Sequence, residues 1–344
     1  MSAGFHSLRW GCAVGLGALL ACTQALEPGD PPGTAPSQLP SVLQEAPGQP
    51  ERFLLTGAWA LADVTGDKLA DLLVISSCEA FVLRSDGRRF LPPASWAAEL
   101  PCRGLRASTF ADVTGDGRAD ALFVGSGGIT VLRSDGERFL PGEAWTAGPY
   151  HGTVSTLFAD VTGDGRADAL SINDYGDGVV VRRSDGGRFL PNERLWTGGP
   201  YVGTVSTLFA DVTGDGRADA LSVNDYGDGV VVRRAAQGVF LPNEPWSGGV
   251  YLGTTGTVFA DVTADGLADA LAFDRAGLQV RRSDGTRFLP LESWASALGN
   301  DLALTFFADV TGDGAADAVF RERHSGQWWV APSTGNALGP REKW

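Results

Sequence analysis

Six short acidic loops carry the most distinctive chemistry of this chain. Each begins with Asp-Val-Thr, and their first residues, 48 to 51 positions apart, are Asp63, Asp112, Asp160, Asp211, Asp261 and Asp309. In loop 112–120, aspartates stand at positions one, five and nine, threonine at three and glycine at six. These side chains offer only oxygen, and calcium binds six to eight oxygens in a flexible shell. The spacing therefore predicts a calcium site in each loop, up to six in all.

The predicted ligands occupy positions one, three, five and nine, with the backbone carbonyl of position seven added in five loops. By loop they are Asp63, Thr65, Asp67 and Asp71; Asp112, Thr114, Asp116, Arg118 and Asp120; Asp160, Thr162, Asp164, Arg166 and Asp168; Asp211, Thr213, Asp215, Arg217 and Asp219; Asp261, Thr263, Asp265, Leu267 and Asp269; and Asp309, Thr311, Asp313, Ala315 and Asp317. Magnesium fits less well because it demands regular octahedral geometry. The loops lack histidine and cysteine, which argues against zinc or copper.

The loops are not equal, and metal binding is not the only interpretation of them. Lys68 stands where the other five loops have glycine, so loop 63–71 is expected to be the weakest site. The alternative is six acidic turns stabilised by hydrogen bonds from their own side chains. We favour calcium, because three converging carboxylates repel one another without a cation. The formal charge of −14 argues against nucleic acid as a partner.

The loops mark six repeats of about fifty residues. Each repeat also ends in a tryptophan, at Trp96, Trp145, Trp196, Trp246, Trp294 and Trp344. Between these marks, short apolar stretches alternate with Asp-Gly turns, which predicts four short strands per repeat. Four strands per repeat are typical of a propeller blade. We therefore expect an all-β, six-bladed β-propeller of four-stranded blades over residues 51–344. Seven blades or a solenoid are the alternatives.

How such a ring closes is left open by the sequence. The segment "RFLLTGAW" from Arg52 matches an outer strand that could seal the last blade. It aligns equally well as the lead-in to the first strand of the first repeat.

The loop pattern Asp-x-Thr-x-Asp-Gly-x-x-Asp resembles the calcium loop of FG-GAP and VCBS repeats over about residues 53 to 344. Such repeats occur in the propeller heads of integrin α subunits, in fungal lectin propellers and in bacterial surface proteins. The resemblance implies the propeller fold and the calcium. It does not imply a ligand, because those proteins bind proteins, sugars or nothing known. This chain also lacks the Phe-Gly and Gly-Ala-Pro that give the family its name.

The N-terminus predicts export. Residues 1–21 combine Arg9 with a short apolar run and end in Leu-x-Ala before Cys22. This pattern resembles a bacterial lipoprotein signal, in which Cys22 becomes lipidated. A plain secretory signal is the alternative. Residues 22–50 are rich in proline and predict a flexible tether. The protein is thus expected to be lipid-anchored in a bacterial envelope, at the outer membrane or cell surface, and to touch membrane only through that anchor.

Cysteines and tyrosines occupy equivalent positions of successive repeats. In an oxidising compartment, Cys78 and Cys102 are expected to form a disulfide across the first junction between blades. The equivalent pairs are Tyr175 with Tyr201 and Tyr226 with Tyr251, which should therefore also meet. They either pin neighbouring blades together or, with Asn173 and Asn224, line two clefts that bind sugar.

Two repeats are nearly identical. The 34-residue segments that start at Tyr150 and Tyr201 differ only at His151 against Val202 and Ile172 against Val223. Two similar clefts on one rigid ring would gain avidity for a multivalent surface. A recent duplication explains the same identity without any function.

Catalytic chemistry is scarce in this sequence. His151 and His324 stand in non-equivalent positions, and neither a Gly-x-Ser-x-Gly elbow nor a zinc motif is present. We therefore expect a monomeric, non-catalytic, calcium-stabilised surface module that binds a glycan. Adhesion to a surface protein and a structural envelope role are the alternatives. A polysaccharide lyase that uses His324 is a further one.

Overall fold

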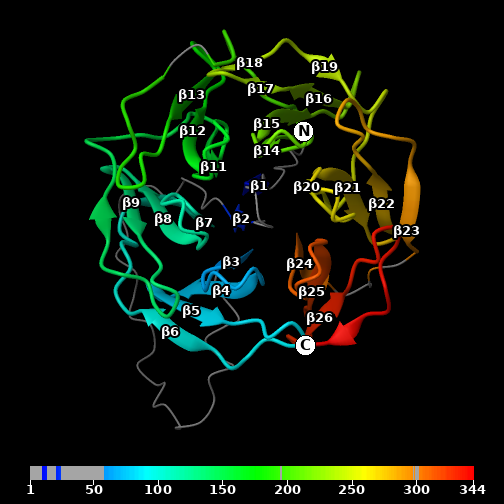
Figure 1. The fold of residues 1–344 in the computed structure, drawn as a ribbon, viewed down its shortest axis with the longest axis horizontal. Helices are drawn as coiled ribbons and strands as arrows, with labels where there is room; N and C mark the ends of the chain where they lie inside the picture. The colour runs from blue at the N-terminus through cyan, green and yellow to red at the C-terminus, as the bar shows by residue number, and fades with distance from the viewer. Residues whose placement is uncertain (1–9, 14–20, 25–57, 194–195, 297, 299–301) are drawn as a thin grey trace, which may run out of the picture.

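The computed structural model describes residues 10–13, 21–24, 58–193, 196–296, 298 and 302–344. Six antiparallel sheets surround a common axis, and the first strand of each sheet lies nearest the centre (Figure 1). Each sheet is built from one sequence repeat. The chain is therefore all-β, and its fold is a β-propeller of six blades, as predicted.

Each blade runs outward from its first strand to its last in chain order. Blades 1 and 2 are β3 (Ala58–Ala62), β4 (Asp71–Ser76), β5 (Glu79–Leu83), β6 (Ala94–Ala97); and β7 (Leu105–Ala111), β8 (Asp120–Gly125), β9 (Gly128–Leu132), β10 (Glu143–Ala144). Blades 3 and 4 are β11 (Ser155–Ala159), β12 (Asp168–Ile172), β13 (Val179–Arg182); and β14 (Ser206–Ala210), β15 (Asp219–Val223), β16 (Val230–Arg233), β19 (Glu244–Pro245). Blades 5 and 6 are β20 (Gly256–Ala260), β21 (Asp269–Asp274), β22 (Gly277–Arg281), β23 (Glu292–Ala295); and β24 (Leu302–Ala308), β25 (Asp317–Glu322), β26 (Trp328–Ala331), β27 (Glu342–Lys343).

Two blades depart slightly from this plan. In blade 3 a single bridge between Val181 and Glu193 takes the place of the fourth strand. Blade 4 adds a small hairpin of β17 (Ala235–Ala236) and β18 (Val239–Phe240). Both departures lie toward the outer edge of the ring, so the inner strands keep the same pairing throughout.

The acidic loop connects the first and second strands of every blade. In blade 3, Ala159 pairs with Asp168, and the same two positions pair in the other five blades. The second strand is buried along almost its whole length, for example over β12 and β15. A strand covered on both faces is a continuous apolar run in the sequence, which explains the apolar residues that follow the last aspartate of each loop.

Aromatic side chains join neighbouring blades. The tryptophan that ends one repeat packs on a phenylalanine of the next blade, with ring centroids 5.4 Å apart for Trp145 and Phe189 and 5.3 Å for Trp196 and Phe240. The Phe189 amide also donates to the Trp145 carbonyl. Such pairs add to the energy of simple burial. The repeated tryptophans are therefore the contacts that hold the blades side by side.

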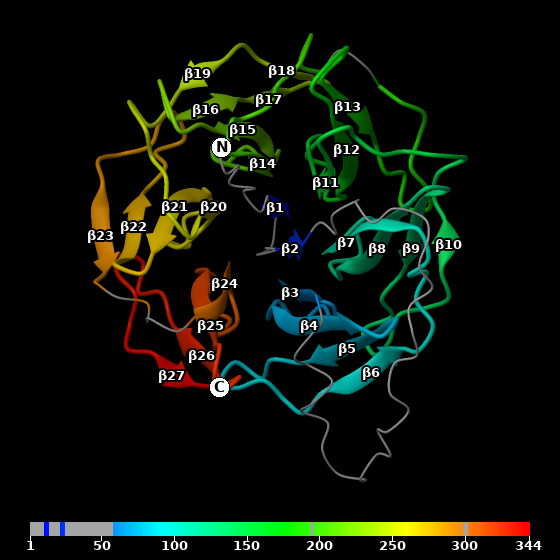
Figure 2. The ribbon, with the colours of Figure 1, turned by 180° about the vertical axis from the view of Figure 1, so that it is seen from behind.

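The ring closes between blades 6 and 1 by the same contacts (Figure 2). The Ala70 amide donates to the Asp309 carbonyl over 2.7 Å, as its equivalents do at the other five junctions. Trp344 packs on Phe90 at 5.2 Å. Blade 6 has its own outer strand in β27, and Trp59 belongs to the inner strand β3. No strand is exchanged among the described residues, which favours the lead-in interpretation of the segment from Arg52, most of which lies outside them.

The predicted signal and tether lie largely outside the described residues. Within them, β1 (Trp10–Ala13) pairs with β2 (Ala21–Gln24), and both lie at the centre of the ring near β3, β7, β11 and β14 (Figure 1). Export, cleavage and lipidation of Cys22 stay predictions. Among the residues that the structure describes, no helix is long and apolar enough to cross a membrane.

Candidate functional site

The first aspartate of each loop organises the loop around its own carboxylate. Asp112 Oδ1 accepts hydrogen bonds from the amides of Thr114 (3.1 Å) and Gly115 (2.7 Å), and Oδ2 accepts one from Gly117 (2.8 Å). Asp160 and its equivalents repeat this pattern with small variations. Amides that point to one carboxylate make a tight turn, as in an Asx-turn. The first aspartate is therefore a structural acceptor in this structure.

The ninth position holds a fully buried carboxylate. Asp120 accepts from the amide of Val113 in its own loop (3.2 Å) and from the amide of Ser134 after the third strand (2.9 Å). Burial raises the pKa of Asp120 from 3.8 to about 7. The same cause raises the pKa to about 7 in Asp71, Asp168, Asp219 and Asp269, and to about 6 in Asp317. This carboxylate thus joins two turns of each blade.

The residue at the seventh position, which can pair with the aspartate at the fifth, divides the loops into two groups. In loop 112–120, Asp116 forms an ion pair of 2.6 Å with Arg118, and loops 160–168 and 211–219 contain the same pair. The Arg118 Nε also donates to the Ser134 carbonyl. The remaining loops have Leu69, Leu267 or Ala315 at the position of Arg118. Three loops therefore pair their fifth-position aspartate with an arginine of their own, and three have an apolar residue in place of that arginine.

The donor set of the loops suits a hard divalent cation, because it consists of carboxylate, hydroxyl and carbonyl oxygen. In this structure the carboxylates face amides of their own chain. Among the described residues, no three acidic, histidine or cysteine side chains are gathered so as to hold a metal ion. The arrangement is that of hydrogen-bonded acidic turns, the alternative weighed from the sequence. The chemistry of the donors fits calcium, and calcium binding stays a prediction.

Lys68 adopts the backbone conformation that the loop demands of glycine. Its φ is 72°, against 82° for Gly117 at the same place in the next loop. A side chain in this left-handed region costs about 1 kcal/mol. Loop 63–71 thus has a lysine in this conformation where the other five loops have glycine, and its weakness as a metal site stays a prediction.

Cys78 and Cys102 meet at the junction of blades 1 and 2 as free thiols. The two side chains are hydrogen-bonded, and burial together with this contact raises the pKa of Cys102 to about 12. Ser77 and Cys78 form the two-residue turn between β4 and β5, with φ of 53° and 63°. Thiols this close can be oxidised to a disulfide, so the bond stays a prediction for an oxidising compartment.

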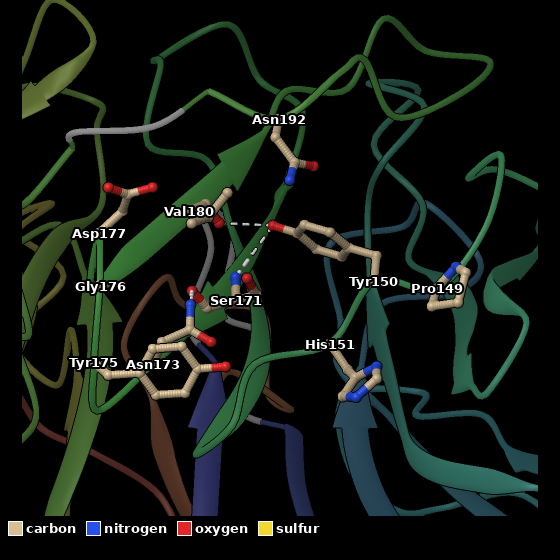
Figure 3. A pocket seen from close by; sticks show the side chains of 10 residues that line it. All are labelled: Pro149, Tyr150, His151, Ser171, Asn173, Tyr175, Gly176, Asp177, Val180 and Asn192. Atoms are coloured by element: carbon tan, nitrogen blue, oxygen red, sulfur yellow. Dashed lines mark hydrogen bonds between the residues drawn. The ribbon is translucent and has the colours of Figure 1, made fainter.

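A cavity of about 360 Å³ opens on blade 3 (Figure 3). The linker from blade 2 contributes Pro149, Tyr150 and His151; the turn after β12 contributes Tyr175, Gly176 and Asp177; the remainder are Ser171, Asn173, Val180 and Asn192. Tyr175 is 66% exposed and borders the cavity with its ring. Tyr226 is 65% exposed at the same place on blade 4. Both predicted tyrosines of these turns are therefore accessible to a ligand.

The partner tyrosines correct the predicted pairs. Tyr201 is buried, with only 4% of its surface exposed. Its hydroxyl donates to the Val231 carbonyl (2.6 Å) and accepts from the Ser222 amide (3.0 Å). Tyr251 is equally buried and equally bonded. An arginine of the same blade lies over each ring, Arg233 over Tyr201 and Arg281 over Tyr251. Neither tyrosine offers the exposed aromatic face expected from the sequence. The cavity is lined instead by Tyr175 and by Tyr150 of the same repeat.

The side-chain amides of Asn173 and Asn224, predicted to line the clefts, form hydrogen bonds with their own blades. Asn173 Oδ1 accepts from the Thr153 amide (3.1 Å), and its Nδ2 donates to the Gly178 carbonyl (2.8 Å). Asn224 makes the equivalent bonds in blade 4. Their first role is thus to shape the turn that presents the tyrosine, although Asn173 does line the cavity.

Sequence reasoning did not select Tyr150, Asp177 or Asn192 as parts of a site. The signal for Tyr150 was present, because it occupies the position of Tyr201 in the twin repeat. Asn192 could not be found in this way, because it reaches the cavity from the outer edge of the blade. Its amide oxygen accepts from Arg182 Nε, and the Arg182 guanidinium lies over the Tyr150 ring at 4.6 Å.

Fold and loops together define a six-bladed β-propeller in which an acidic loop joins the first two strands of each blade. Residues 112–171, 160–222 and 211–272 match the family described as FG-GAP-like repeat. The chain thus contains FG-GAP-like repeats, as its loops predicted. No curated protein matches the chain.

Solved structures show the same architecture. An Agrocybe aegerita lectin, described as recognising non-reducing terminal N-acetylglucosamine, is 25% identical over 83% of this chain and 79% of its own, with a TM-score of 0.60. A Tc holotoxin pore of Photorhabdus luminescens is 18% identical over 85% of this chain, with a TM-score of 0.62. This chain covers only 14% of the toxin chain, so that likeness concerns the fold alone.

Proposed function

We propose that this protein is a non-catalytic, sugar-binding propeller. The observation that carries the proposal is the open cavity of blade 3 with Tyr175 exposed at its edge. Aromatic rings stack on the C–H faces of sugars, while nearby polar groups bond the hydroxyls. Blade 4 repeats the same turn with Tyr226, so a second site of the same kind is available for avidity.

The likeness to the Agrocybe aegerita lectin supports a sugar as the ligand. It covers most of both chains, and the lectin recognises a terminal N-acetylglucosamine. That sugar is therefore the first probe for the cavity of blade 3 and for the equivalent turn of blade 4 with Tyr226. Adhesion to a surface protein is the alternative that the same exposed tyrosines would serve.

Calcium and a lipid anchor belong to the same proposal. The oxygen donors of the six loops would hold calcium, which would offset the repulsion of their carboxylates. Lipidation at Cys22 would tether the ring to the envelope and leave the cavities free to meet a multivalent surface.

The arrangement of the histidines supports a role without catalysis. His324 lies in the turn between β25 and β26 of blade 6, whereas His151 borders the cavity of blade 3. A lyase that uses His324 would need a substrate site on blade 6, whereas the described cavity lies on blade 3.

Binding of the full-length protein to immobilised N-acetylglucosamine tests the proposal. Replacing both tyrosines, Tyr175→Ala with Tyr226→Ala, should abolish binding without lowering the melting temperature, because both rings are exposed. The matched control, Tyr175→Phe with Tyr226→Phe, keeps the rings and should keep most of the binding. Undiminished binding of the alanine variant would contradict the site, and an absence of binding to any glycan on an array would contradict the function.

A further inference from the structure

The side chains around the cavity of blade 3 are largely engaged by the protein itself. The Tyr150 hydroxyl donates to a backbone carbonyl of β13 and accepts from a backbone amide of β12. The Asn173 oxygen accepts from the Thr153 amide, and its nitrogen donates to the Gly178 carbonyl. Asn192 differs, because its amide nitrogen has no hydrogen-bond partner within the part of the chain that the structure describes. Asn192 therefore has a donor left for a ligand.

The orientation of the Asn192 amide is fixed by an arginine. Arg182 Nε donates to Asn192 Oδ1. A guanidinium offers only N–H donors, so the amide oxygen must face Arg182 and the amide nitrogen must face away from it. Figure 3 shows this nitrogen directed toward the Tyr150 side chain. Asn192 thus presents a donor to the cavity and cannot present an acceptor while Arg182 holds it.

An apolar and an acidic side chain lie at the same end of the cavity as Asn192. Val180 and Asp177 line this end, whereas Tyr175 and His151 lie toward the opposite one (Figure 3). A carboxylate accepts several hydrogen bonds, so Asp177 can accept one from a ligand in addition to its contact within the protein. The end of the cavity near Asn192 therefore combines a donor, an apolar surface and an acceptor.

The fixed asparagine occurs on the same two blades as the exposed tyrosines. Arg233 Nε donates to Asn243 Oδ1 in blade 4, as Arg182 Nε does to Asn192 Oδ1 in blade 3. In the other four blades, the residue before the start of the outer-strand pairing is Pro93, Gly142, Leu291 or Arg341. The donor and the exposed aromatic ring thus accompany each other around the ring of blades.

The three groups near Asn192 match an acetamido substituent. Its carbonyl oxygen is an acceptor, its methyl group is apolar and its N–H group is a donor. A sugar hydroxyl lacks the methyl group, and a free amine lacks the carbonyl oxygen. The cavity volume of about 360 Å³ lies at the lower end of the usual range for ligand pockets, about 300–1,000 Å³, which suits a single sugar ring.

We propose that the cavity of blade 3 is specific for 2-acetamido sugars and that Asn192 determines this specificity by donating to the acetamido carbonyl oxygen. Asp177 accepts from the acetamido N–H group, Val180 contacts the methyl group, and Tyr175 stacks on the sugar ring. Arg182 is a positioning residue, because it acts through Asn192. The proposal rests on the proposed function and adds the part of the sugar that is recognised.

The test compares N-acetylglucosamine, glucose and glucosamine as ligands of the full-length protein, with dissociation constants measured by calorimetry. The variant Tyr226→Ala removes the exposed ring of blade 4, so that binding reports on the cavity of blade 3. We expect N-acetylglucosamine to bind about tenfold more tightly than glucose, because glucose brings neither the carbonyl oxygen nor the methyl group to Asn192 and Val180. Saturation-transfer NMR should show the strongest signal at the acetyl methyl group.

Asn192→Asp, added to the same variant, removes the donor and keeps the bond to Arg182. Affinity for N-acetylglucosamine should fall about tenfold, because a carboxylate oxygen would face the acetamido carbonyl. Glucosamine should bind more tightly than before, because its ammonium group pairs with a carboxylate. The matched control is Asn243→Asp, the same change on blade 4, which should leave all three affinities unchanged. Both asparagines are exposed, so neither change should lower the melting temperature.

Arg182→Leu tests the positioning role. Without the guanidinium the Asn192 amide can turn over, so the preference for N-acetylglucosamine over glucose should fall. Arg182→Lys keeps a donor for Asn192 Oδ1 and should restore most of the preference. Equal binding of N-acetylglucosamine and glucose by the Tyr226→Ala variant, or a preference that survives Asn192→Asp, would overturn the proposal. Failure of the proposed function gives a different result, in which none of the three sugars binds to the unmodified protein.

Discussion

The acidic loops and the cavity of blade 3 differ in how closely the repeats agree on the residues that form them. The loops use the same aspartates and nearly the same backbone hydrogen bonds in every blade. The cavity of blade 3 is lined by His151, where the twin repeat has Val202. Features that all six repeats share thus maintain the ring, and features that change from one junction to the next can carry recognition.

The physical reason lies in where the contacts come from. A loop is satisfied by backbone amides, which every repeat supplies whatever its sequence. The cavity of blade 3 depends on side chains, among them His151 and Asn192, so its chemistry changes with the sequence of the repeat. Substitutions in the two regions should therefore separate stability from binding.

The largest effect is expected at the buried aspartate of a loop. Replacing Asp168 by alanine leaves the amides of Val161 and Ser184 without acceptors inside the protein. Two buried unsatisfied donors should lower the free energy of unfolding by about 3 kcal/mol. Urea unfolding measures the loss. Asp164→Ala in the same loop is the control and should cost under about 1 kcal/mol, because its carboxylate forms an ion pair near the surface. Equal losses would contradict the distinction.

The same buried aspartates predict how stability depends on pH without metal. Their pKa is raised from 3.8 to about 7 in the folded protein, for example at Asp168 and Asp219. The folded state therefore holds protons that the unfolded state has already lost between about pH 4 and 7. Stability in EDTA should fall as the pH rises through this window. Melting temperatures measured at about pH 5 and pH 8 test the sign, and a higher value at pH 8 would contradict it.

The smallest effect is expected where the twin repeats differ in one hydroxyl. Ser184 Oγ donates to the Val113 carbonyl over 2.6 Å, and four other blades have an equivalent serine. Blade 4 has Ala235 at this place. Ala235→Ser should stabilise the protein by about 1 kcal/mol through a bond to the Val161 carbonyl, and Ser184→Ala should cost about as much. Chemical denaturation of both variants measures the pair, and a shift of the same sign in both would count against it.

The fold could be predicted because its signals are local. Asp-Gly turns and the loop pattern recur in a constant register, so the strands, the six blades and the position of each loop followed from the sequence. Ring closure could not be decided in this way, because the segment from Arg52 fits either end of a blade. The structure decided it with β27, which gives the sixth blade an outer strand of its own.

The candidate site was harder to predict because exposure depends on the packing of neighbouring elements. Tyr175 and Tyr201 are equally aromatic, yet one projects from a turn and the other is buried under Arg233.

The absence of strand exchange has a consequence for how such a ring can change over time. Each described blade is a complete unit of one repeat, and the junction between Trp344 and Phe90 is of the same type as the internal ones. A duplicated repeat could therefore enter the chain as a finished blade, with no half-sheet to be completed elsewhere. The ring could likewise be opened at another junction by joining the present ends, so a circularly permuted chain would have the same neighbours in a different order.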